Sequence, residues 1–218
     1  MTGTLQCQCG KVMFHIGDTT PRMKLECGCC DCRQALSWGE IQGGPKLPSH
    51  RPVIGMYFGN DILVVSGKEN LQWYKLREGG SSIRWVARCC MTTMVVHHPA
   101  YMNKIFCTFT DGVKCGGDIP KDVKTVCRIQ MKTYPKEMIK HLTPFSNGGK
   151  EIDIKAAEED KELLNEYGKF NDVKRFEEAF INGTFFDLHE VESRIGKTTQ
   201  DYLNEADNNI IVLNLKEV

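Results

Sequence analysis

Cysteine is the residue whose number and spacing indicate chemistry in this chain of 218 residues. There are 11 cysteines, and an odd number in tight groups argues against a disulfide framework, because residues this close in sequence rarely meet disulfide geometry. Such groups more often bind metal or carry thiol chemistry in a reducing compartment. Three groups stand out: Cys7 and Cys9; Cys27, Cys29, Cys30 and Cys32; and Cys89 and Cys90.

The second group, "CGCCDC", has a spacing suited to an open zinc site. Cys27, Cys29 and Cys32 offer three thiolates from one turn, and zinc prefers four ligands in a tetrahedron. The fourth position is then free for a substrate thiolate or for water. Cys30 has the wrong phase to bind the same ion. The alternative is a structural zinc that a distant side chain, such as a histidine, closes as fourth ligand.

The order of four segments resembles the glutathione-dependent formaldehyde-activating enzyme family, which includes centromere protein V-like proteins. These segments are "LQCQCGKVMFHI", "CGCCDCRQA", "MYFGNDILVVSGKENLQWYKL" and "SIRWVARCCMTTMV". The residues that match the family pattern are Cys7, Cys9 and Gly10; Cys27, Cys29, Cys32 and Arg33; and Gly67, Leu71 and Tyr74. The resemblance covers roughly residues 4 to 110.

The resemblance implies two metal sites. It assigns Cys27, Cys29 and Cys32 to a catalytic zinc near which glutathione binds. It assigns the C-x-C opening, Cys7 and Cys9, to a structural zinc that a late C-x-x-C motif completes.

The late motif departs from the family pattern. With Arg84 and Thr92 in register, Cys90 takes the place of the second cysteine, whereas Ala87 replaces the first and Met91 replaces a glycine. This departure leaves three alternatives for the fourth ligand of the structural zinc site. Cys89 completes it through a shifted turn, another group completes it, or the site binds no metal.

The rest of the sequence predicts a mainly β protein, α+β overall. We expect a small antiparallel zinc-binding domain over residues 1–133, with strands at "KVMFHI", "DILVVSG", "SIRWVAR", "TMVVHH" and "NKIFCTFT". "IQGGPKLPSHRP" has the composition of a long loop. Residues 134–218 are rich in Ala, Glu, Lys and Leu and predict an α-helical extension, with Asn171 as an N-cap and Gly183 as a stop.

The formal net charge of zero disfavours nucleic acid as a partner. No long apolar run or signal peptide is visible, so we expect a cytoplasmic protein with no membrane partner. The resemblance implies a carbon–sulfur lyase-like enzyme for formaldehyde detoxification, with one or two zinc ions, glutathione as co-substrate, and small-molecule thiol and aldehyde substrates. The alternative is an inactive, zinc-stabilised scaffold whose helical tail binds a protein or forms a homo-oligomer. A chromatin or microtubule role ranks third.

Overall fold

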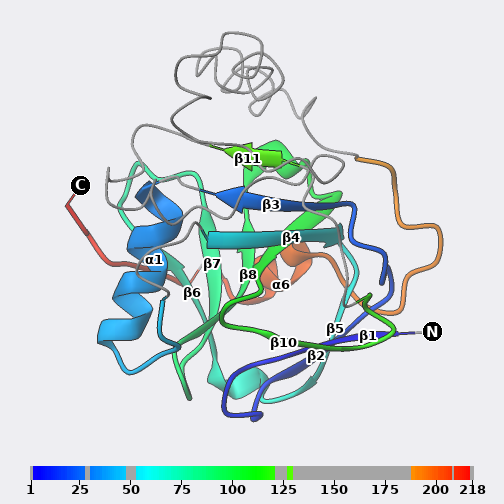
Figure 1. Cartoon of the computed structure of the whole chain (residues 1–218), viewed down its shortest axis with the longest axis horizontal. Helices are drawn as coiled ribbons and strands as arrows, with labels where there is room; N and C mark the ends of the chain where they lie inside the picture. Colours follow the sequence, from blue (N-terminus) through cyan, green and yellow to red (C-terminus); the bar gives the residue numbers. More distant parts are fainter. Residues whose placement is uncertain are drawn as a thin grey trace, which may run out of the picture.

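The computed structural model describes residues 2–27, 30–47, 53–120, 127–129, 188–207 and 209–216. Within these ranges the protein is mostly β, with two α-helices (Figure 1). The helices are α1 (Cys30–Ile41) and α6 (Thr199–Glu205), and two short 3-10 turns are η1 (Lys68–Asn70) and η2 (Pro99–Tyr101). None of the described helices is long and apolar enough to cross a membrane.

The strands form two sheets. The smaller has the order β10 (Lys114–Gly117), β1 (Gly3–Gln6), β2 (Met13–Ile16), β5 (Ile62–Ser66). The larger has the order β11 (Cys127–Ile129), β3 (Met23–Cys27), β4 (Val53–Gly59), β9 (Ile105–Phe109), β8 (Thr92–His97), β7 (Ile83–Ala87), β6 (Leu71–Lys75), β12 (Ile210–Val212). All pairings are antiparallel except β11 with β3 and β12 with β6, so the larger sheet is mixed. The prediction of a mainly β fold is confirmed, and most of the strand pairings are antiparallel.

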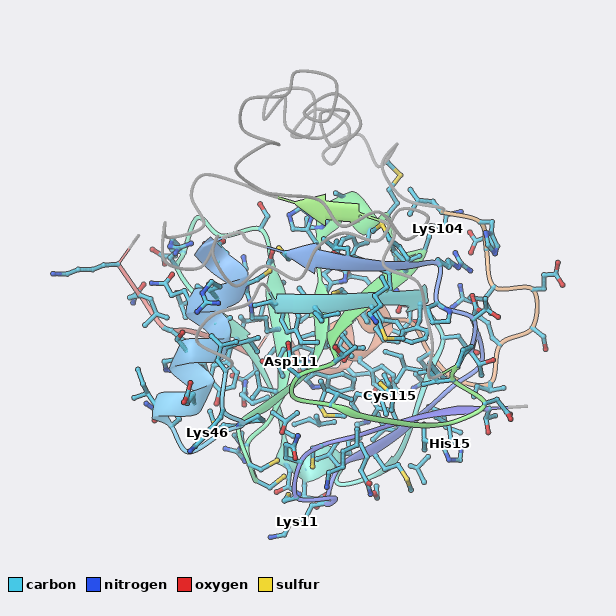
Figure 2. All side chains as sticks on the ribbon, viewed as in Figure 1. Lys11, His15, Lys46, Lys104, Asp111 and Cys115 are labelled. Carbon is cyan, nitrogen blue, oxygen red and sulfur yellow. The ribbon has the colours of Figure 1, made fainter. Side chains whose placement is uncertain are left out.

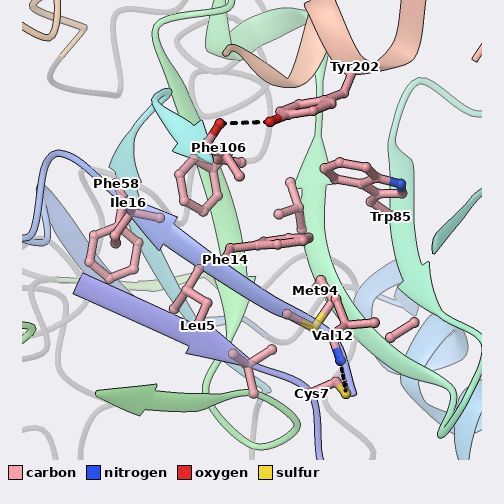
Figure 3. Packing of buried hydrophobic residues seen from close by; sticks show 14 of the residues in the cluster. Leu5, Cys7, Val12, Phe14, Ile16, Phe58, Trp85, Met94, Phe106 and Tyr202 are labelled. Atoms are coloured by element: carbon pink, nitrogen blue, oxygen red, sulfur yellow. Dashed lines mark hydrogen bonds between the residues drawn. The ribbon is translucent and has the colours of Figure 1, made fainter. Parts of the chain in front are cut away.

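The larger sheet carries apolar side chains on both of its faces. Along β4, Met56 and Phe58 belong to one buried cluster, whereas Val53 and Tyr57 belong to another. Successive strand residues point to opposite faces, and both faces of this sheet are covered. Strands β7, β8 and β9 are therefore buried along their whole length. The first cluster also contains Phe14 of the smaller sheet (Figure 3). Helix α1 covers the second cluster.

Helix α1 is an element that the sequence analysis did not predict. It begins at Cys30, within the cysteine-rich segment, and includes Cys32, which the spacing of the cysteines had placed in a turn. Asp31 lies in its first turn, where a carboxylate stabilises the positive end of the helix dipole. Cys32 and Leu36 pack against the second buried cluster. The helix therefore brings Cys32 to the same face of the sheet as Cys27 at the end of β3.

The described end of the chain packs on the β-sheets. Strand β12 pairs with β6, and the hydroxyl of Tyr202 in α6 donates a hydrogen bond to the carbonyl of Ile62 at 3.0 Å (Figure 3). Asp61 accepts hydrogen bonds from the backbone N–H groups of Ile195 and Gly196, both at 2.8 Å. Residues 130–187, which include the predicted cap and stop at 171 and 183, lie outside the described residues, so the helical extension stays a prediction.

Candidate metal centre and thiol site

Four cysteines from two distant turns meet at one point. The ligand atoms of Cys7, Cys9, Cys89 and Cys90 all lie within 4.8 Å of one another. The measured Sγ–Sγ distances are 3.6 Å for Cys7–Cys9, 3.9 Å for Cys7–Cys89, 3.4 Å for Cys9–Cys89 and 4.0 Å for Cys89–Cys90. Thiolates about 2.3 Å from a tetrahedral zinc ion are about 3.8 Å apart. The cluster is therefore compatible with zinc.

Two backbone turns position these sulfurs. In the first turn, the N–H of Gly10 donates to the carbonyl of Cys7 at 3.0 Å, and Gly10 has φ 82°. In the second, the N–H of Cys90 donates to the carbonyl of Ala87 at 3.2 Å, and Met91 has φ 48°. Both turns thus pass through the left-handed region directly after a cysteine. Glycine adopts this conformation without steric cost, whereas methionine does not.

The surroundings of the cluster favour a bound cation. The N–H of Val12 donates to the sulfur of Cys7 at 3.3 Å, a contact that stabilises a thiolate (Figure 3). A backbone hydrogen bond from Lys11 lowers the pKa of Cys9 to about 7. Burial raises the pKa of Cys7 and that of Cys89, so both would stay protonated without a positive partner. A divalent ion supplies the charge that allows these two thiols to ionise.

The departure from the family pattern at Ala87 has a structural counterpart. Ala87 is the last residue of β7 and is fully buried in the core, while Cys89 and Cys90 both lie in the following turn. Adjacent residues tend to point apart, yet here both sulfurs reach the cluster because the turn ends in the left-handed conformation at Met91. The structure thus brings Cys89 together with Cys7, Cys9 and Cys90.

The other predicted site is described only in part. Cys27 ends β3 and Cys32 lies in the first turn of α1, and both pack with the second buried cluster. Cys29 lies outside the described residues, as does Gly28, and the side chain of Cys30 is not described. The geometry of Cys27, Cys29 and Cys32 as a three-thiolate set therefore stays a prediction.

Two buried tyrosines lie next to Cys27 and Cys32. The rings of Tyr57 and Tyr101 meet edge to face with centroids 5.6 Å apart. Burial raises the pKa of both phenols well above the usual value, and nearby Cys27 and Cys107 add to the effect. The charge of Cys32 also raises the pKa of Tyr101. Both hydroxyls therefore stay protonated, and the two phenols are hydrogen-bonded to each other.

Arg84 and His98 complete this region, and the sequence analysis gave neither a role in it. The ring of His98 lies 5.6 Å from that of Tyr101, and an Nη atom of Arg84 contacts the carbonyl of Asp31 at 3.4 Å. Asp31 directly precedes Cys32. The signal in the sequence was an arginine within the apolar strand "SIRWVAR", where alternation points it to the opposite face from Ile83 and Trp85.

The remaining described cysteines lie apart from the four-cysteine cluster. Cys107 is buried on β9 and Cys115 is exposed on β10 (Figure 2). His97 is hydrogen-bonded to the hydroxyl of Thr199 through Nδ1 at 2.9 Å. It therefore ties α6 to β8.

Comparison with known proteins gives no further evidence on identity. No family model, no curated protein and no solved structure matches the chain. The resemblance to the glutathione-dependent formaldehyde-activating family therefore stays a prediction that rests on the quoted motifs.

Proposed function

We propose that the protein is a zinc-dependent enzyme that forms or cleaves adducts between glutathione and an aldehyde. In the forming direction, the thiol sulfur bonds to the carbonyl carbon and the thiol proton moves to the carbonyl oxygen. Atoms and electrons balance without an oxidant or a reductant. Cleavage is the reverse of this step.

The observation that supports this proposal is the convergence of Cys27 and Cys32 beside Tyr57 and Tyr101. The two thiols come from separate elements, β3 and α1, and pack in the same cluster as the protonated phenols. Zinc held by these thiols, with Cys29 as the third, would stabilise an incoming thiolate. In this proposal one of the two hydrogen-bonded phenols, Tyr101 or Tyr57, redirects its O–H to the aldehyde oxygen when substrate binds, which stabilises the charge that develops there. Burial excludes competing water from this contact.

The four-cysteine cluster has a different role in this proposal. Cys7, Cys9, Cys89 and Cys90 together provide four sulfurs, which leaves no position for a substrate. We assign them to a structural zinc that joins the turn after β1 to the turn after β7. Such a bond contributes directly to folding free energy.

An assay of the zinc-loaded protein with glutathione and formaldehyde tests the proposal. We expect the wild type to accelerate exchange between free and adduct glutathione, followed by NMR. Cys32→Ser should abolish the acceleration and release one zinc ion per chain while retaining the ion of the four-cysteine cluster. Cys115→Ser is the matched control, since this exposed thiol lies on the smaller sheet, and it should match the wild type. A wild type that does not accelerate the exchange and does not bind glutathione would refute the proposed enzyme activity.

A scaffold is the second candidate, because the one metal cluster found among the described residues is closed by four protein thiols. In that case one zinc ion per chain is expected, and it should not exchange ligands with added thiols. Metal content and thiol binding thus separate the two candidates.

A further inference from the structure

Arg84 is a buried cation in an interior strand of the larger sheet. It is only 3% exposed, although it lies in β7 between Ile83 and Trp85. Its cross-strand neighbours are Tyr74 on β6 and Val96 on β8. Directly opposed residues share a face, so the side chain lies on the face that α1 covers. An arginine at such a position is costly unless its charge and its N–H groups are satisfied.

Within the described part of the chain, the guanidinium group of Arg84 has no anionic partner. Its two hydrogen bonds are 3.4 Å long and go to backbone carbonyls, those of Ser82 and Asp31. Its Nε has no hydrogen-bond partner in the described ranges. Among the described residues no carboxylate lies within ion-pair distance of Arg84. The carboxylate of Asp31 is instead bound by Arg77 at 2.7 Å.

The start of α1 makes the region around Arg84 more favourable for an anion, whereas the nearby imidazole of His98 adds no charge. Burial, with the charges of His97 and Arg84, lowers the pKa of His98 to about 4, so this imidazole is neutral near pH 7. The Arg84 guanidinium also lies beneath the first turn of α1, the positive end of that helix dipole. It contacts the residue before Cys32, which places it next to the thiol site described above.

We propose that Arg84 binds a carboxylate group of the substrate beside Cys32. The unpaired Nε and the weakly bonded Nη2 form one edge of the guanidinium fork, and a planar carboxylate accepts both N–H groups of such an edge. A phosphate dianion would need further cations, but Arg77 is already paired with Asp31. The inference rests on the proposed function for the thiol part of the ligand. It assigns a specific binding residue, Arg84, to a carboxylate of that thiol substrate.

Arg84→Met, Arg84→Lys and the exposed control Arg88→Met test this assignment by calorimetric binding. The first removes the donors at similar volume, and the second keeps the charge but removes the fork. Three probes separate the interactions. Glutathione has a thiol and carboxylates, S-methylglutathione has the carboxylates without a free thiol, and cysteamine has a thiol without a carboxylate.

We expect Arg84→Met to weaken binding of glutathione and S-methylglutathione by about 10- to 100-fold, as for a lost charged hydrogen bond, and to leave cysteamine binding and zinc content unchanged. Arg84→Lys should weaken binding of these two probes by a smaller factor, and Arg88→Met should leave their binding unchanged. If Arg84→Met does not fold, Arg84→Lys still decides, since it keeps the buried charge and must bind S-methylglutathione more weakly than the wild type.

Other outcomes overturn the assignment. S-methylglutathione bound equally by all variants, or not bound by the wild type, would exclude a carboxylate at Arg84. Loss of zinc and of cysteamine binding in Arg84→Met would show that Arg84 balances the charge of the cysteines instead. The wild type could also bind S-methylglutathione through Arg84 and yet show no adduct activity. That result would support the carboxylate site and refute the proposed enzyme activity.

Discussion

The sulfurs of Cys9 and Cys89 lie 3.4 Å apart although the residues are 80 positions apart in the sequence. Cys9 belongs to the turn after β1 of the smaller sheet, and Cys89 to the turn after β7 of the larger sheet. A metal ion bound between them would therefore link the two sheets as well as the two turns.

Replacement of Cys89 should release this metal ion. We expect Cys89→Ser to lose one zinc ion per chain and about 3 kcal/mol of unfolding free energy, because a zinc site contributes directly to folding. This corresponds to a melting temperature lower by about 6–12 °C for a chain of this size. Zinc analysis and thermal unfolding followed by circular dichroism measure both effects.

Chelation of the wild type should produce a similar loss of stability, whereas Cys115→Ser should leave both the metal content and the melting temperature unchanged. Cys115 is exposed on β10 and lies outside the cluster. A Cys89→Ser protein that keeps its full zinc content would contradict the four-thiolate site.

Replacement of Met91 by glycine should stabilise the protein. Met91 has φ 48°, where a side chain costs about 1–2 kcal/mol and glycine costs none. The greater freedom of glycine in the unfolded chain offsets part of the gain, so we expect about 0.5–1 kcal/mol. Arg88→Gly, in the same turn but without a positive φ, is the matched control and should destabilise. Denaturant unfolding measures both, and a less stable Met91→Gly would argue against relief of strain.

Removal of the Tyr202 hydroxyl should weaken attachment of α6 to the smaller sheet. The hydroxyl donates to the carbonyl of Ile62 and accepts from the N–H of Val64 at 3.3 Å. Loss of these buried contacts should cost about 1–2 kcal/mol in Tyr202→Phe, seen in thermal unfolding. The control is Tyr74→Phe, because the Tyr74 hydroxyl makes no hydrogen bond to described residues. Equal melting temperatures for the two variants would show that the Tyr202 contacts contribute nothing.

His98 should make the protein less stable in mild acid. Burial lowers its pKa from 6.5 to about 4. Between these pH values the unfolded chain binds one proton more than the native protein, so the free energy of unfolding falls as the pH is lowered from 6.5 to 4. We expect a contribution on the order of 1–2 kcal/mol, reduced by partial exposure of the ring.

The variant His98→Asn isolates this contribution. Asparagine can accept the hydrogen bond that Nδ1 of His98 accepts from the N–H of Ala100 at 3.0 Å, and it does not titrate. Its stability should vary less steeply with pH than that of the wild type. If the two proteins lose stability in parallel over this range, other groups account for the acid sensitivity.

The sequence by itself determined the strands and the groups of cysteines. Alternation in "KVMFHI" and the apolar runs of "SIRWVAR" and "NKIFCTFT" predicted β2, β7 and β9, because strand periodicity is a local property. Helix α1 was missed, since the dense cysteines at its start suggested a turn and its burial depends on contacts with the sheet.

Only the tertiary structure decided which cysteines meet. Alignment with the family pattern could not decide whether Cys89, another group or no group supplies the fourth metal ligand. The direction of the Cys89 and Cys90 sulfurs depends on the backbone conformation at Met91. In the same way, the sequence shows Arg84 in an apolar strand but does not predict its partners, which depend on the packing of β6, β8 and α1 around it. Metal and ligand sites combine residues from distant turns, so their geometry is fixed only when the sheets pack.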